Sequence, residues 1–190
     1  MARGSFCKGF IFLVPLFLFL FGCKNKFGQL PNIDDITDHP TLSAVDIDLY
    51  QSQNGKTNLR IIAHIVNVYS FQEEPTTDFP EGINVEFFDE DGVVTSYFRA
   101  NSAIYYDKQN RWEAFGDIQA QNIEGAVFNT EYIEWDEISG EIKSDRAVKI
   151  TDKEGTFYGR GFRSKQDFTD WTILNPTGEF LIDQNEFKGE

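Results

Sequence analysis

Few side chains in this sequence are of the kinds that perform catalysis. The 190 residues contain two histidines, His39 and His64, and two cysteines, Cys7 and Cys23. Both cysteines lie near the N-terminus, so the rest of the chain has no thiol nucleophile, no disulfide and no thiolate metal site. His64 falls in an Ile- and Val-rich stretch, where we interpret it as a surface or hydrogen-bonded strand residue.

The acidic residues form no recognisable site either. The segment DEDG at 89–92 resembles the start of a calcium loop, but the later ligands of such a loop are missing, so it predicts a β-turn. Adjacent acids such as Glu73 and Glu74 point apart in an extended chain and make no acid–base pair by themselves. The formal charge of −14 argues against a nucleic-acid partner. We therefore predict no enzyme activity, no catalytic residue, no cofactor and no metal site.

The N-terminus has the three-part layout of a bacterial secretion signal. Arg3 and Lys8 precede an apolar run over 10–21, and the segment LFGC then ends at Cys23. The run is shorter than the roughly 20 residues of an ordinary spanning helix. LFGC resembles a lipobox, which predicts cleavage and lipidation at Cys23; the alternative is an uncleaved anchor. Both interpretations tether the remainder to a membrane, outside the cytoplasm.

The remainder predicts an all-β domain. Residues 1–22 are the predicted signal or anchor, 23–41 a linker with two prolines, and 42–185 the folded domain. Residues 45–52 alternate between apolar and polar, Asn54-Gly55 is a strong hairpin signal, and 57–71 is the return strand. We expect a loop at 72–82 and, at Gly116, either a bulge or a close backbone approach. Many short strands with evenly spaced turns indicate a sandwich or an open jelly roll.

A weak repeat runs through the centre of the domain. The segment YFRANSAIYYD at 97–107 alternates, and its Ile104 and Tyr106 align with Ile133 and Trp135, 29 residues later. Phe162 follows Ile133 by the same spacing. Units of this kind bury their apolar faces by stacking. The alignment predicts that these side chains share one face of the sheet.

That predicted inner face is rich in aromatic and aliphatic groups. Two interpretations stay open: a closed core, or a groove that takes an apolar ligand. The candidate groove residues are Phe98, Ile104, Tyr106, Trp112, Ile133, Trp135, Val148, Phe162 and Trp171. Gly159 and Gly161 are expected where a strand returns to the sheet, at a point where the backbone approaches the groove or an edge.

The order of these segments resembles a known family. GINVEFFDEDG is followed by SYFRANSAIYYDKQNRWEAFGDIQAQ, then FNTEYIEWDEISGEIKSDRAVKI, then GTFYGRGFRSKQDFTDWTI. This order, after an export signal, is similar to LptC, a membrane-anchored periplasmic family of lipopolysaccharide export. The resemblance covers about residues 43–180. It departs at the N-terminus, because the family often has one spanning helix where this chain has Cys23.

The resemblance implies an open, twisted β-jelly roll of the OstA type, built of stacked antiparallel strands, with lipid acyl chains in an apolar groove. The implied partners are lipopolysaccharide, the ABC transporter LptBFG as donor and an LptA-like bridge as acceptor. The implied location is the periplasmic side of the inner membrane of a Gram-negative bacterium. The alternative function is a surface β-sandwich lipoprotein that binds glycans through exposed Trp and Tyr side chains.

Overall fold

A computed structural model describes residues 37–177, and every element named in it is a strand. The strands are β1 (Leu42–Gln53), β2 (Lys56–Tyr69), β3 (Thr76–Phe79), β4 (Ile83–Phe88), β5 (Val94–Ala100), β6 (Ser102–Tyr106), β7 (Arg111–Asn122), β8 (Val127–Asp136), β9 (Glu141–Thr151), β10 (Thr156–Lys165) and β11 (Trp171–Thr177). They form one 11-stranded sheet in which all pairs are antiparallel. The prediction of an all-β fold is confirmed, and the arrangement is consistent with a jelly roll.

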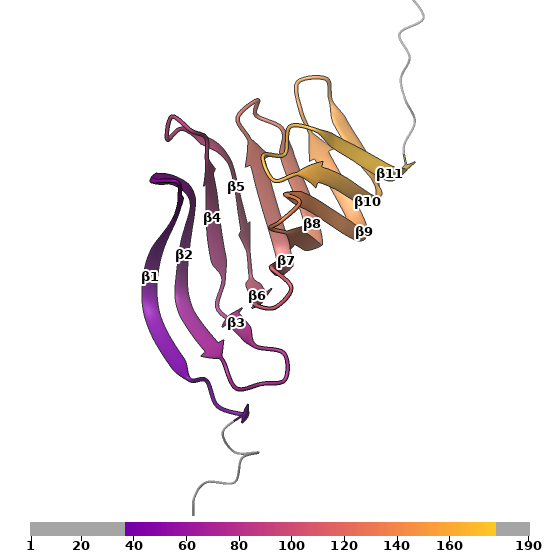
Figure 1. Cartoon of the computed structure of the whole chain (residues 1–190). Coiled ribbons are helices and arrows are strands. Elements are labelled where there is room, and N and C mark those ends of the chain that lie inside the picture. Colours follow the sequence, from indigo (N-terminus) through magenta and orange to yellow (C-terminus); the bar gives the residue numbers. More distant parts are fainter. Residues whose placement is uncertain (1–36, 178–190) are drawn as a thin grey trace, which may run out of the picture. The chain divides into compact units, whose positions relative to one another are not determined.

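Four of the strands act as two interrupted long strands. β3 and β4 lie one after the other beside β2, and β5 and β6 lie in the same way beside β7. The sheet therefore runs from β1 through β2, the β3/β4 line and the β5/β6 line to β7, and then in sequence order to β11 (Figure 1). β1 pairs only with β2, and β11 only with β10, so these two strands form the edges.

The sheet folds over on itself. Phe87 on β4 and Trp135 on β8 are separated within the sheet by β5 and β7, yet their ring centroids lie 5.1 Å apart. Neighbouring strands are about 4.8 Å apart. In a flat sheet these two rings would be separated by three such spacings, about 14 Å. The part of the sheet that contains β4 and β5 thus faces the part in which β8 approaches its turn.

Irregular residues mark the line along which the strands bend. The β7–β8 register shifts between Phe115 and Ile118, where Gly116 and Asp117 have φ of 75° and 43°. Gly161 in β10 has φ of 78°, beside a register shift of its own. Such bulges bend a strand and increase its twist. The predicted bulge at Gly116 is confirmed, and we call this line the crease.

Local turn chemistry accounts for several connections. Asn54 and Gly55 both have positive φ, 55° and 80°, as the β1–β2 hairpin requires. Asp89 Oδ1 accepts hydrogen bonds from the backbone N–H of Asp91 and Val93, which shapes the predicted turn at 89–92. The predicted loop at 72–82 is wrong in part, because β3 forms there and pairs with β2 and β6. Thr76 and Thr77 are β-branched, which favours a strand despite the flanking prolines.

Candidate lipid-binding interior and two surface hollows

Six of the nine predicted groove residues lie inside the folded sheet. Their exposed fractions are 0–7%: Phe98, Trp112, Ile133, Trp135, Val148 and Phe162. A seventh, Trp171, is half-buried and packs edge-on against Phe128 at 6.0 Å. Side chains fill the interior, so these residues form a packed core in this structure.

The prediction that Ile104 and Tyr106 share this face is wrong. Ile104 pairs with Glu113, whereas the inward Ile133 pairs with Ala114, the neighbour of Glu113 on the other face of β7. The cause is the interruption at Asn101, where β5 ends and β6 begins. In β6 it is Ala103, 2% exposed, that points inward. Inward-pointing side chains therefore have even residue numbers before Asn101, as in Phe98, and odd residue numbers after it, as in Ala103.

The corrected spacing of the repeat is one residue longer than the 29 residues inferred from the sequence. Tyr106 pairs with Arg111 at the end of one hairpin, and Asp136 pairs with Glu141 at the end of the next. These equivalent positions are 30 residues apart, an even spacing that aligns Tyr106 with Asp136 on the outer face.

Charges hold Tyr106 on the outer face. The Arg111 guanidinium lies 4.2 Å from the centroid of its ring, and the tyrosine hydroxyl donates a hydrogen bond of 3.2 Å to Glu113. Partial burial, together with the nearby Glu113 carboxylate, raises the pKa of Tyr106. Lys143 extends the network to Glu134 with a contact of 2.8 Å. Tyr106 thus belongs to a surface ion-pair network.

A chain of stacked aromatic rings crosses the interior. Phe79 stacks on Trp112 at 5.6 Å, and Trp112 stacks on Trp135 at 5.8 Å. Trp135 then meets Phe87 edge-on at 5.1 Å, and Phe87 lies 6.2 Å from Phe98. Such pairs contribute about 0.5–1.5 kcal/mol each beyond area burial. Phe79 was missed in the sequence because it lies in the segment expected to be a loop.

A second aromatic cluster fills the end near β11. Phe128 contacts Phe162 at 6.0 Å and Phe168 at 5.1 Å. Phe168 belongs to the polar β10–β11 turn, yet it is 1% exposed and has φ of 55°. Asn122 Nδ2 donates a hydrogen bond of 2.8 Å to the Phe168 carbonyl, which fastens the turn to the opposite part of the sheet. No sequence signal distinguished this phenylalanine from an exposed turn residue.

The interior has the chemistry of a hydrocarbon environment. The buried polar residues between 37 and 177 are neutral: Ser96, Asn122, Thr130, Ser144 and Ser164. Within the same range, no group of three acidic, His or Cys side chains is arranged to hold a metal ion. Such an interior can bury apolar groups and offers no charged group for acid–base chemistry.

A hollow of about 250 Å³ opens at one end of this interior, and we call it the mouth. Leu59, Phe87 and Trp135 form its apolar lining. The polar lining comes from Gln51, Ser52, Gln53, Asn58, Glu137 and Gln166. Gln51 Nε2 donates a hydrogen bond of 2.9 Å to Glu137 Oε1, which connects β1 with the β8–β9 turn. The aromatic chain of the interior therefore reaches the surface at this point.

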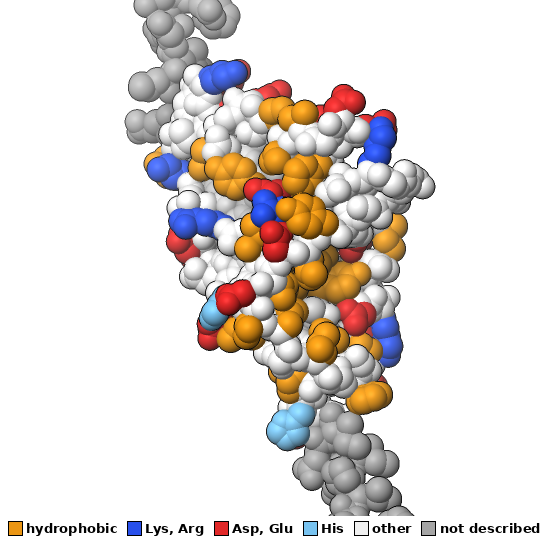
Figure 2. Space-filling view, turned by 90° about the vertical axis from the view of Figure 1, so that its left-hand side faces the viewer, with side chains coloured by type: hydrophobic (Ala, Val, Ile, Leu, Met, Phe, Trp, Pro, Cys, Tyr) orange, Lys and Arg blue, Asp and Glu red, His pale blue; other side chains and the backbone are white. Residues whose placement is uncertain are grey.

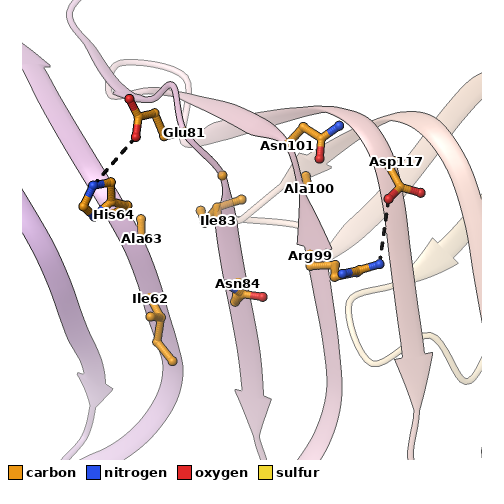
Figure 3. A pocket seen from close by; sticks show the side chains of 11 residues that line it. Ile62, Ala63, His64, Glu81, Ile83, Asn84, Arg99, Ala100, Asn101 and Asp117 are labelled. Atoms are coloured by element: carbon orange, nitrogen blue, oxygen red, sulfur yellow. Dashed lines mark ion pairs between the residues drawn. The ribbon is translucent and has the colours of Figure 1, made fainter.

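A second hollow, of about 350 Å³, lies at the crease (Figure 3). Its lining mixes apolar and polar residues and carries two separate ion pairs, His64 with Glu81 at 3.8 Å and Arg99 with Asp117 at 3.8 Å. The hydrogen bond from His64 Nδ1 to Asp46, 2.6 Å long, raises the pKa of the imidazole. These side chains are half exposed or more, so we assign them to the surface support of the bend.

The β1 edge presents apolar side chains to solvent. Leu42, Val45, Leu49 and Tyr50 are 50–65% exposed. Seen from the side on which β1 lies, hydrophobic side chains form a broken band with charged groups among them (Figure 2). A long edge strand with exposed apolar groups is a template for pairing with a further strand. This edge is thus a second feature with the character of a binding surface.

The two glycines singled out in the sequence are both buried in β10. A Cβ on Gly159 would lie 2.2 Å from Ile173 Cγ2 and 2.7 Å from the Asn175 carbonyl oxygen. A Cβ on Gly161 would meet Leu174 and the Ser144 carbonyl oxygen at 3.2 Å, at a φ of 78°. Both glycines are thus places where β11 approaches β10 closely.

Comparison with known proteins identifies the family. The family model described as "Lipopolysaccharide-assembly, LptC-related" matches residues 12–176. The chain belongs to the LptC family. Membership makes it a component of lipopolysaccharide transport, in a family that acts in transport and binding and that is associated with lipopolysaccharide export at the inner membrane. No individually curated protein matches the chain.

The predicted membrane-attachment segment of this LptC-family chain lies outside the described residues. Cys23 and the apolar run at 10–21 fall within that part, so lipidation at Cys23 stays a prediction. Between residues 37 and 177, no helix is long and apolar enough to cross a membrane.

Proposed function

We propose that this LptC-family protein is attached to the inner membrane, accepts lipopolysaccharide from the ABC transporter LptBFG, and passes it to an LptA-like bridge. The acyl chains would lie between the two facing parts of the folded sheet, in the periplasm. The observation that carries this proposal is the neutral, aromatic interior that reaches the surface at the mouth. The lipid crosses without a covalent step, in keeping with an interior whose buried polar residues, among those described, are neutral.

Hydrocarbon burial supplies the driving force for loading. Each CH₂ group moved out of water gains about 0.8 kcal/mol, so a lipid with several acyl chains needs a continuous apolar path. The chain of rings from Phe79 to Phe98 provides apolar contacts from one facing part of the sheet to the other. Flat rings can slide and rotate against alkyl chains without losing a specific hydrogen bond, which suits a site that must also release its ligand.

The packed interior must open to admit such a lipid. Few polar contacts connect the facing parts: Gln51 with Glu137, the Ser96 hydroxyl with the Gln166 carbonyl at 2.9 Å, and Asn122 with Phe168. Each hydrogen bond of this kind contributes about 0.5–1.5 kcal/mol net. The remaining contacts are apolar, and acyl chains can replace them at little cost. We infer that the lipid itself separates the two parts, starting from the mouth.

The two edges of the sheet suit strand-to-strand assembly. β1 offers 12 residues with one unpaired side, and β11 offers seven at the opposite end of the sheet. Addition of a strand by a partner would continue the sheet and its apolar face. We propose that these edges connect the protein to the transporter on one side and to the bridge on the other.

Attachment to the membrane would come from the N-terminus. The family match begins at residue 12, inside the apolar run that precedes Cys23. We propose that Cys23 carries the lipid anchor, with the segment at 23–41 as the spacer. The glycan-binding alternative needs exposed Trp and Tyr side chains. Trp112 and Trp135 are only 7% and 3% exposed, which removes the tryptophans from such a site and leaves scattered tyrosines such as Tyr50 and Tyr158.

Photo-crosslinking in cells tests the lipid path with a matched pair of isoleucines. A photoreactive residue at Ile133, which points inward, is expected to capture lipopolysaccharide. The same residue at Ile104, which lies on the outer face, is expected to give no adduct. Glu134 is a second outward control. A folded Ile133 variant without adduct, in cells that export lipopolysaccharide, would refute the proposal.

A further inference from the structure

Positive charge gathers at one end of an otherwise acidic sheet. Residues 37–140 contain 5 Lys and Arg against 19 Asp and Glu, whereas residues 141–177 contain 7 against 6. The second range comprises β9, β10 and β11, which lie side by side at the end of the strand order opposite β1 (Figure 1). An anionic partner is therefore attracted to this end and repelled by the rest of the described chain.

The outer face of these three strands carries most of the cations. Side chains in β9 and β10 alternate between buried and exposed, and the buried ones, such as Val148 and Phe162, belong to the core. In β11, Ile173 packs against the core, so its neighbour in sequence points outward. We call the resulting outer surface the basic platform, and it consists of Lys143, Lys149, Tyr158, Arg160, Arg163 and Leu174.

Two cations of the basic platform have no carboxylate partner. Lys143 and Arg163 each contact a glutamate of a neighbouring strand, at 2.8 Å and 3.6 Å. Lys149 and Arg160 form no ion pair with any residue between 37 and 177, and the Arg160 guanidinium donates instead to the backbone carbonyl of Asp145, at 3.3 Å. The charges of Lys149 and Arg160 are thus available to a further anionic group.

Apolar side chains lie on the same surface. Tyr158, which pairs across the sheet with Lys149, is 51% exposed. Leu174 lies beside Gly161 on the neighbouring strand and is 49% exposed. A surface that combines unpaired cations with exposed apolar groups is complementary to a peptide that carries both carboxylates and large apolar side chains.

The chain itself carries such a peptide directly after β11. Residues 178–190 lie outside the described part and have the sequence GEFLIDQNEFKGE. The stretch 179–187 contains no cation, and it combines three acids with four large apolar residues: Glu179, Asp183, Glu186, Phe180, Leu181, Ile182 and Phe187. Its charge and its apolar content both match the basic platform.

The point at which this segment leaves the sheet puts the basic platform within reach. Thr177, the last residue of β11, pairs with Tyr158 of the platform. Thirteen residues can span up to about 43 Å, whereas neighbouring strands are only about 5 Å apart. Covalent connection gives the segment an effective concentration in about the millimolar range, so contacts that are individually weak are enough to hold it.

We propose that residues 179–187 dock on the basic platform of the same molecule. Their carboxylates pair with Lys149 and Arg160, and their apolar side chains cover Tyr158 and Leu174. This inference goes beyond the proposed function, because it concerns the outer face of the sheet and requires no lipid. β11 has only one neighbouring strand, and the docked segment fastens it to β9 and β10. The edge offered to a partner strand is thereby held in place.

Intramolecular photo-crosslinking in the full-length protein tests the docking. A photoreactive residue replaces Phe187, which lies ten residues beyond Thr177, so chain connection alone does not place it on the platform. After irradiation at low protein concentration, mass spectrometry is expected to find adducts with peptides of β9 or β10. Lys149→Glu combined with Arg160→Glu should lower the adduct yield at least about fivefold, because two attractions become repulsions.

A matched control and a charge swap show whether position or net charge matters. Lys56→Glu combined with Lys108→Glu changes the net charge equally, away from the platform, and should keep the wild-type yield. Glu179→Lys combined with Asp183→Lys, added to the reversed platform, should restore the adducts. If thermal melting shows that the reversed platform is unfolded, salt decides the test, because 1 M salt shortens the screening length to about 3 Å and should lower the wild-type yield.

Three results would overturn the inference. The first is a yield that responds to neither platform reversal nor salt. The second is a set of adducts confined to other parts of the chain or formed only between molecules, which would appear as a yield that depends on protein concentration. The third is the absence of adducts both from this probe and from a second probe at Ile182.

Discussion

Alanine substitution of two isoleucines tests the change of parity at Asn101. Ile133 is 2% exposed within the interior, while Ile104 is half-buried on the outer face of β6. Truncation of a buried Ile to Ala costs about 2–5 kcal/mol, so we expect about 3 kcal/mol for Ile133→Ala. Much of Ile104 stays in contact with water, and its neighbours can relax, so Ile104→Ala should cost about 1 kcal/mol.

Urea unfolding followed by circular dichroism measures this difference. With a slope of about 2 kcal/mol per molar urea, the midpoint should fall by about 1.5 M for Ile133→Ala and about 0.5 M for Ile104→Ala. The 29-residue alignment of the repeat instead predicts equal losses, because it places both side chains on one face. Equal losses, or a larger loss for Ile104→Ala, would refute the corrected assignment.

Three further predictions concern other parts of the chain. Gly159→Ala should lower the melting temperature markedly, because its Cβ would lie 2.2 Å from Ile173 Cγ2; an unchanged value would refute the close approach of β11. The raised pKa of His64 beside Asp46 stabilises the fold below the ordinary histidine pKa, and this stabilisation disappears as pH rises through the folded-state value. Wild type should therefore lose more stability than His64→Gln between about pH 6 and pH 8, and equal losses would contradict the ion pair. Cys23→Ser should abolish metabolic labelling with palmitate, whereas labelling equal to wild type would exclude Cys23 as the anchor.

Alternation and turn residues were enough to predict most of the fold. Turn chemistry is local, so Asn54-Gly55 and the acidic turn at 89–92 could be recognised from a few residues. Within a regular strand the side-chain period is two, so Phe98 and Trp135 could be assigned to the inner face before the structure was known. The bulge at Gly116 was also predictable, because glycine inside a strand usually marks one.

What could not be predicted depends on contacts between distant parts of the sheet. The parity change at Asn101 comes from a break at the crease, and nothing in the alternation of residues 97–107 marks it. Phe168 is buried because its turn is fastened to Asn122, 46 residues away, by a hydrogen bond. The mouth likewise combines Asn58 with Trp135 only after the sheet has folded over. These features belong to tertiary structure, so local patterns carry no signal for them.

Opening of the interior by lipid can be measured directly as a distance between two spin labels. Labels on Gln53, at the end of β1, and on Ile138, in the β8–β9 turn, report the separation of the two facing parts of the sheet. A second pair on Gln53 and Glu90 lies within one part and serves as control. Addition of lipopolysaccharide should move the first distribution to longer distances and leave the second unchanged. An unchanged first distribution, with lipopolysaccharide shown to be bound, would contradict the account.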